Sequence, residues 1–206
     1  MHYESLSQKT KKIWNKCSFL QSENFYLAGG TALALQIGHR ISVDLDFFSF
    51  KPIKKTLLAK VEAKLGNASI LVNTKNELTV LISEVKISFI HYPFILKEKT
   101  INTNIIPLAS VLDIASMKAY TMGRRRSFKD YVDLYFIIFK KITSLKKIIS
   151  NTKEIYKDGF NDRLFCEQLL SPDDLDDEAI IWLSKKQSKS KMQLFFKRKV
   201  QEFLKK

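Results

Sequence analysis

Two aspartates separated by one residue, Asp44 and Asp46, follow the glycine pair Gly29 and Gly30 in the segment YLAGGTALALQIGHRISVDLDFF. Alternate residues of a β-strand point to the same face, so a strand would place the two carboxylates about 6–7 Å apart. Like charges at that distance disfavour each other unless a cation lies near them. The pair therefore predicts a site for Mg²⁺ or Mn²⁺, which oxygen ligands suit. The alternative is a solvated strand face on which Asp44 pairs with Arg40 or a lysine.

The glycine pair precedes the aspartates by the length of one helix, which we expect over residues 31–38. Exposed N–H groups at a helix N-terminus bind anions, and glycine lets a phosphate group come close to the backbone. Thr31 would add an N–H or a hydroxyl to such a site. A phosphate site and a carboxylate pair joined by one helix are typical of metal-dependent phosphoryl or nucleotidyl transfer.

The elements that must position these residues follow from hydrophobic periodicity and turn residues. In the first half we expect helices over residues 5–20, 31–38 and 54–66, and strands over residues 25–27, 42–50, 68–74, 77–83 and 85–94. In the strand 42–50, Val43, Leu45 and Phe47 would face the core, and the aspartates would share the other face. After residue 105 the periodicity is helical, over residues 108–122, 128–142, 144–156 and 185–206, with a further helix starting in 171–180.

The pattern predicts an α+β protein with a mixed α/β unit over residues 1–105 and a helical unit over residues 106–206. The chain has 206 residues, 45% of them hydrophobic, and a net charge of +14. That charge favours nucleic acid, nucleotides or an acidic partner, although a lysine-rich surface alone would also produce it. No apolar run reaches the roughly 20 residues of a membrane span, and no secretory signal is recognised. Cys17 and Cys166 are far apart, which is typical of reduced cysteines in a cytoplasmic protein.

Two sequence blocks resemble a known family. Two glycines, 13 residues and Asp-Leu-Asp resemble the nucleotidyltransferase superfamily signature. More narrowly, Gly-Gly-Thr-Ala-Leu, Gly-His-Arg and Asp-Leu-Asp-Phe-Phe resemble the AbiEii/AbiGii toxin family. The block VLDIASMKAYTMGRRRSFKDYVDLYFI, residues 111–137, is similar to the second conserved part of that family. The resemblance implies a nucleotidyltransferase-type mixed sheet flanked by helices and followed by a helical part.

The resemblance also implies roles for individual residues. In the first block, Gly29, Gly30 and Thr31 would hold the triphosphate of an NTP, and Asp44 and Asp46 would hold the metal. Arg40, preceded by His39, would either orient the carboxylates or contact phosphate.

In the second block, Lys118 would contact nucleotide phosphates, unless it is an ordinary lysine on a helix surface. Asp130 would be a polar catalytic group on the next helix. For Asp133, one turn further along, we expect an ion pair or a capping role.

One position departs from the superfamily pattern. A third carboxylate is usual on a later strand, where this chain has Ser88. Serine cannot act as an anionic ligand at neutral pH and is a poor base without a partner. Glu84 lies too far along the same strand face to replace it, which leaves Asp130 as the candidate for the missing charge. Alternatively the enzyme is slow, or it binds nucleotide without transferring it.

The sequence is therefore compatible with three functions. The first is a Mg²⁺-dependent nucleotidyltransferase that moves an NMP group from an NTP to an RNA (such as tRNA) or protein acceptor. The resemblance implies that such a protein is the toxin of a type IV toxin–antitoxin or abortive-infection system, with a separate antitoxin as partner. The second is a catalytically degenerate module that binds nucleotide or RNA. The third is a structural or regulatory protein whose basic C-terminal helix docks a partner.

Overall fold

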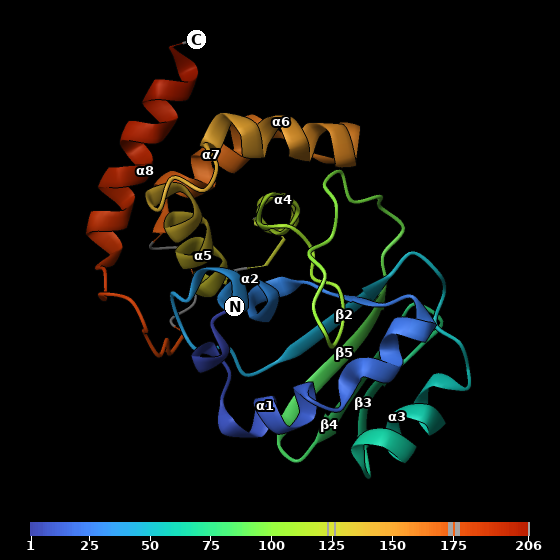
Figure 1. The fold of residues 1–206 in the computed structure, drawn as a ribbon. Helices are drawn as coiled ribbons and strands as arrows, with labels where there is room; N and C mark the ends of the chain where they lie inside the picture. The colour runs from blue at the N-terminus through green and yellow to red at the C-terminus, as the bar shows by residue number, and fades with distance from the viewer. Residues whose placement is uncertain (123, 126, 173–174, 176–177, 206) are drawn as a thin grey trace. The chain divides into compact units, whose positions relative to one another are not determined.

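The computed structural model describes residues 1–122, 124, 125, 127–172, 175 and 178–205. The chain divides into two compact units, Met1–Ser110 and Val111–Lys206. Figure 1 shows the strands in the first unit and α4 to α8 in the second. In the described part of the chain, every helix is too short or too polar to span a lipid bilayer.

The N-terminal unit contains one five-stranded mixed sheet. Its strands are β1 (Tyr26–Leu27), β2 (Leu45–Ser49), β3 (Ser69–Asn73), β4 (Glu77–Ile82) and β5 (Val85–His91), in the spatial order β1-β2-β5-β4-β3. β2 and β5 are parallel, and every other neighbouring pair is antiparallel. β4 and β5 are joined by a two-residue turn at Ser83 and Glu84, both with positive φ, as tight hairpins require. A strand is observed within each of the five predicted segments, and the α+β fold class is confirmed.

The helices of the N-terminal unit are η1 (Tyr3–Ser5), α1 (Gln8–Trp14), η2 (Cys17–Glu23), α2 (Gly29–Ile37) and α3 (Leu57–Leu65). The predicted single helix over residues 5–20 is wrong. Ser7 caps α1 by accepting a hydrogen bond from the Thr10 N–H, so the helix starts at Gln8. After Asn15 the chain tightens into the 3-10 helix η2, which buries Cys17 and Leu20.

The predicted strand 42–50 begins three residues late. Its first residues bond elsewhere: the Ser42 N–H donates to Ser5 O at 2.8 Å, and Val43 O accepts from Thr10 Oγ1 at 2.9 Å. These bonds hold the segment away from a sheet ladder, and Val43 is 48% exposed instead of facing the core. Asp44 consequently lies just before β2, and only Asp46 of the two aspartates belongs to the strand.

The two faces of β2 and β5 carry different kinds of side chain. Phe47 on β2 and Phe89 on β5 are register partners, are fully buried and stack at 5.5 Å between ring centroids. Because side chains alternate along a strand, Asp46 and its register partner Ser88 lie on the opposite face. The aromatic face thus anchors β2 and β5 while the other face carries the polar groups.

The helical unit contains α4 (Val111–Thr121), α5 (Phe128–Phe139), α6 (Leu145–Tyr156), η3 (Lys157–Gly159), α7 (Asp162–Leu170) and α8 (Lys189–Leu204). α4 packs on α5 and α6, while α8 packs on α5, α6 and α7 (Figure 1). Serine side chains cap α5, α6 and α8 at their first turns. These helices confirm the predicted periodicity, although α8 begins at Lys189, after its cap.

The helix predicted to start in residues 171–180 is not observed at its described end. Glu178, Ala179 and Ile180 have no helical structure. The acidic residues on which the prediction rested, Asp173, Asp174, Asp176 and Asp177, lie outside the described residues. Glu178 instead turns its carboxylate to the first turn of α5.

Candidate active site

Gly29 is the first residue of α2 and lies next to the carboxylate of Asp46. Its φ is +65°, a backbone conformation that suits glycine. A Cβ atom placed on Gly29 would lie 2.8 Å from Asp46 Oδ2, which is closer than real Cβ atoms come to other groups. The Ala28 N–H donates to Asp46 O at 3.0 Å, so the backbone also holds the two segments together. The glycine turn and one predicted catalytic aspartate are thus brought into contact.

Gly30, the second glycine, makes room for the guanidinium of Arg40. A Cβ atom on Gly30 would overlap Arg40 Nη2. Arg40 is 4% exposed, and its Nη1 donates to Ile41 O at 3.2 Å. A buried cation at the N-terminus of α2 adds to the positive end of the helix dipole, so this turn is suited to an anion.

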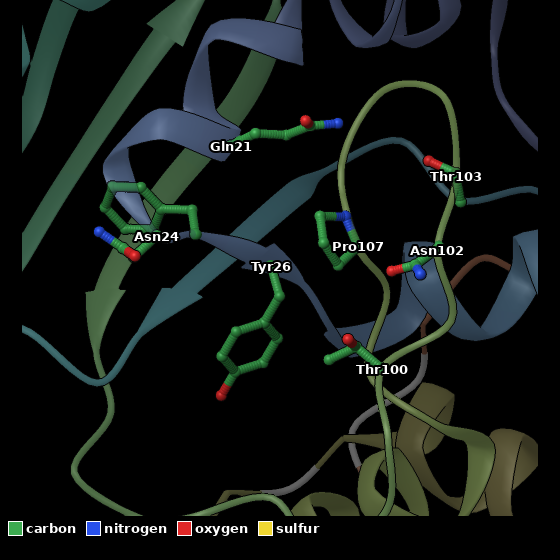
Figure 2. Close-up of a pocket in the computed structure, with 8 residues that line it drawn as sticks. Gln21, Asn24, Tyr26, Thr100, Asn102, Thr103 and Pro107 are labelled. Carbon is green, nitrogen blue, oxygen red and sulfur yellow. The ribbon is translucent and has the colours of Figure 1, made fainter.

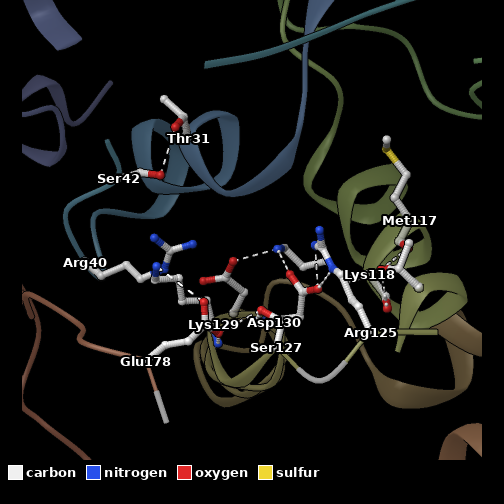
Figure 3. Close-up of polar contacts among 12 residues, drawn as sticks. Thr31, Arg40, Ser42, Met117, Lys118, Arg125, Ser127, Lys129, Asp130 and Glu178 are labelled. Atoms are coloured by element: carbon white, nitrogen blue, oxygen red, sulfur yellow. Dashed lines mark hydrogen bonds and ion pairs between the residues drawn. The ribbon is translucent and has the colours of Figure 1, made fainter. Parts of the chain in front are cut away.

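The Thr31 hydroxyl is hydrogen-bonded within the protein, whereas the sequence offered it, or the Thr31 N–H, as a phosphate contact. The side chain is buried, and its Oγ1 donates to the Asp44 carbonyl and lies 2.8 Å from Ser42 Oγ. Figure 3 shows the contact between Thr31 and Ser42. The hydroxyl therefore ties the segment that carries Asp44 to α2, and only the Thr31 N–H is left for a phosphate group.

Asp44 and Asp46 lie in different surroundings. Asp44 Oδ2 is 3.5 Å from Lys86 Nζ, and both side chains are partly exposed. This is the lysine alternative that the sequence left open for Asp44. Lys86 could not be singled out from the sequence, because its proximity depends on the parallel register of β2 and β5. Asp46 lies two residues further along the chain, on β2, opposite Ser88.

Ser88 occupies the position next to Asp46, about 4.8 Å away between strands. Glu84 is not on that strand face: it lies in the β4–β5 turn and pairs with Lys9 at 2.5 Å. Within the described residues, no three His, Cys, Asp or Glu side chains converge as a metal site. The donors present are two carboxylates. They fit a cation such as Mg²⁺, which takes one or two protein carboxylates and completes its shell with phosphates and water.

In the helical unit, Lys118 lies between two aspartates of α5. Its Nζ is 2.6 Å from Asp130 Oδ1 and 2.7 Å from Asp133 Oδ2, and all three side chains are buried. The second oxygen of Asp130 accepts from Arg125 Nε at 2.8 Å (Figure 3). Lys118 is therefore not an ordinary surface lysine, and Asp133 forms the ion pair expected for it. The network holds Asp130 in one orientation.

The first turn of α5 binds a carboxylate from the segment before α8, which the sequence did not indicate. Glu178 Oε2 accepts from the Lys129 N–H and from Ser127 Oγ, both at 2.9 Å. Partial burial alone would raise the pKa of Glu178, but these hydrogen bonds and the nearby Lys129 ammonium outweigh it and lower that pKa. Glu178 thereby acts as a second cap of α5.

Comparisons with known proteins give one matching family model, one relative by sequence and several similar structures. Residues 18–206 match the family model described as nucleotidyl transferase AbiEii toxin, type IV TA system. An uncharacterized protein of Aquifex aeolicus, aq_aa25, is 34% identical over 185 residues, which are 88% of each chain. The crystal structure of JHP933 from Helicobacter pylori superposes with a TM-score of 0.61 at 20% identity, covering 95% of this chain and 92% of that one. The nucleotidyltransferase toxin MenT4 from Mycobacterium tuberculosis superposes with a TM-score of 0.59 at 16% identity, covering 94% and 84%.

Proposed function

Because the chain belongs to the AbiEii nucleotidyl transferase toxin family, we propose that it transfers an NMP group from an NTP to an acceptor in a Mg²⁺-dependent reaction. The observation that carries this proposal is the contact between the Gly29 backbone and the Asp46 carboxylate. It supports the proposal because the turn that would bind phosphate lies beside the carboxylate that would hold the metal. The acceptor is RNA, such as tRNA, or a protein; the net charge of +14 favours RNA.

The glycine turn and the side chains beside it would bind the triphosphate together. The N–H groups at the start of α2 and the buried Arg40 guanidinium would neutralise and orient the phosphate oxygens. Asp44 and Asp46 would hold Mg²⁺ or Mn²⁺. When bound there, the cation would stabilise negative charge on the reacting phosphate. Thr31 keeps Asp44 beside the first turn of α2 through its hydrogen bond to the Asp44 carbonyl.

Lys118 and Asp130 remain in the proposal as catalytic groups of the helical unit on the strength of the family motif. Their ion pair orients the Asp130 carboxylate, which suits it to accept a proton or a hydrogen bond. Asp130→Asn keeps the size and removes the charge. Transfer at the wild-type rate by Asp130→Asn would remove this residue from the catalytic set.

The test is a transfer assay with purified protein, each of the four α-labelled NTPs, Mg²⁺ and total RNA. We expect labelled RNA with the wild type, and a loss of at least about 100-fold with Asp46→Asn and with Asp44→Asn. Asp158→Asn, which changes an exposed acid on η3, is the matched control and should label normally. Transfer that persists in Asp46→Asn would contradict the proposed chemistry.

A second candidate function is favoured by Ser88. Without a carboxylate beside Asp46, the site would bind NTP and metal without efficient transfer. Calorimetry with NTP and Mg²⁺ would then show binding that is lost in Asp46→Asn, together with no labelling. Ser88→Asp would restore labelling if the missing carboxylate is the cause.

A toxin role would place the protein in the cytoplasm with an antitoxin encoded beside it. Induced expression should stop growth, and Asp46→Asn should remove the effect. A neighbouring helix-turn-helix gene that restores growth when co-expressed would support a type IV or abortive-infection pair. Growth arrest by Asp46→Asn as strong as by the wild type would contradict a catalytic toxin.

A further inference from the structure

The N-terminal unit has a cavity of about 430 Å³ beside the edge strand β1. Figure 2 shows its lining side chains around a common space, contributed by η2, β1 and the loop of residues 100–107. None of the lining residues is charged, although the chain carries a net charge of +14. The site is therefore built for an uncharged group, unlike the basic surface of the protein as a whole.

The walls of the cavity are fixed by hydrogen bonds. The loop is attached to β1 by the Leu27 N–H, which donates to Pro107 O at 2.9 Å. Ile101 and Leu108 close the loop through two reciprocal backbone bonds of 2.8 and 2.9 Å. Gln21 Nε2 ties η2 to the loop by donating to Ile105 O at 2.8 Å. A cavity held in this way is formed before a ligand arrives, which lowers the entropic cost of binding.

Three lining side chains keep their hydrogen-bonding capacity for a ligand. The amides of Asn24 and Asn102 and the hydroxyl of Thr100 make no side-chain hydrogen bond with any described residue. Each amide presents a donor and an acceptor side by side. Beside them, Phe25 and Tyr26 give the cavity buried aromatic surface. The lining thus combines two aromatic residues with unused donors and acceptors.

The cavity is close to the proposed phosphate and metal site. Tyr26 is the register partner of Phe48 and stacks with it at 6.0 Å. Asp46 precedes Phe48 by two residues on β2, so Asp46 and Tyr26 share a face of the sheet, about 7 Å apart along the strand direction and about 4.8 Å apart across it. A group bound in the cavity would be within the reach of one nucleotide from Asp46.

We propose that this cavity binds an unpaired nucleobase. A base is flat and uncharged and has donors and acceptors along its edge, which the two asparagine amides can match. The volume lies within the range of small-molecule sites. The assignment of the base to a substrate rests on the proposed nucleotidyl transfer. The base belongs either to the NTP or to the terminal nucleotide of an RNA acceptor.

The first experiment uses probes without phosphate or metal. Ligand-observed NMR with adenosine, guanosine, cytidine and uridine is compared for the wild type, Asn102→Ala and Asn24→Ala. Each variant removes one amide from an exposed position, and we expect a three- to tenfold weaker binding of the preferred nucleoside. Asn104→Ala is the matched control, because Asn104 is an exposed amide of the same loop that does not line the cavity. Equal nucleoside binding by the wild type and both cavity variants would overturn the proposal.

The second experiment identifies the source of the base. Affinities for the four NTPs with Mg²⁺, for tripolyphosphate, and for short RNAs with each 3′-terminal base are measured on the same variants. A change confined to the NTP ranking assigns the cavity to the donor base, and a change confined to the RNA ranking assigns it to the acceptor. Tripolyphosphate binding should be unchanged by Asn102→Ala and lost in Asp46→Asn. Retention by Asp46→Asn would count against the proposed function and leave the nucleoside result standing.

Discussion

The contact between Gly29 and Asp46 leads to a prediction for Gly29→Ala. Two costs arise in the folded state. A non-glycine residue in the left-handed region costs roughly 1–2 kcal/mol. In addition, the new Cβ would lie 2.8 Å from Asp46 Oδ2, so the carboxylate must leave its rotamer, at about 0.5–1.5 kcal/mol. We therefore expect Gly29→Ala to lower the free energy of unfolding by roughly 1.5–3.5 kcal/mol.

Gly38→Ala separates these two costs. Gly38 has φ +60°, close to that of Gly29, so the backbone cost and the effect of alanine on the unfolded chain are nearly the same. Its Cβ would meet the ring of His2, an exposed side chain at the N-terminus that can swing away. Gly38→Ala should lose only about 1–2 kcal/mol. The difference between the variants then measures the displacement of Asp46.

Urea denaturation of both variants, alone and combined with Asp46→Ala, is the assay. With Asp46 truncated, the cost of Gly29→Ala should fall to that of Gly38→Ala, while Gly38→Ala should be unaffected. In the transfer assay, Gly29→Ala should lose about 100-fold, because a shift of roughly 1 Å in a catalytic group has that effect. Equal stability and equal transfer for the two variants would refute a functional contact between Gly29 and Asp46.

Three further predictions concern groups that are buried or partly buried. Lys118→Met leaves two buried aspartates without their shared ammonium and should cost about 3–5 kcal/mol in urea denaturation; a loss below about 1 kcal/mol would contradict the network. Glu178 has a pKa lowered from its ordinary value of 4.5, so its stabilisation is present above pH 4.5 and is lost as the pH falls through the lowered folded-state value. Glu178→Gln should flatten the fall in melting temperature below pH 4.5, and an unchanged pH profile would argue against this cap. Burial raises the pKa of Cys17 to about 12 and that of Cys166 to about 11, so a thiol reagent at pH 8 should label neither in the native protein and both after denaturation.

Local patterns predicted most of the elements, since each depends on residues close in sequence. Alternating apolar residues marked β4 and β5, and Gly38 marked the end of α2. The errors arose where distant segments compete for backbone groups. Residues 42–44 have strand-like alternation, yet their hydrogen bonds go to Ser5, Thr10 and Thr31. No local pattern contains those partners.

The same distinction holds for the site. The glycine pair, Asp44 and Asp46 stood out because their chemistry requires these residue types at a short spacing, which one helix and one strand impose. The contact of Arg40 with Gly30 required the three-dimensional path of the chain after α2. So did the pairing of Lys86 with Asp44, which depends on the parallel register of β2 with β5, two strands separated by about 40 residues.

The sequence by itself determined the residue types of the proposed chemistry, their order and the α+β class, because these depend on composition, spacing and periodicity. Tertiary structure decided which of these groups are available to a substrate or a metal ion. It committed the Thr31 hydroxyl to the Asp44 carbonyl, moved Glu84 into a turn, and buried Lys118 between two aspartates. It also formed an uncharged cavity from two separate segments, residues 21–26 and 100–107. These outcomes depend on the burial and hydrogen bonding of groups far apart in the chain, which no local spacing encodes.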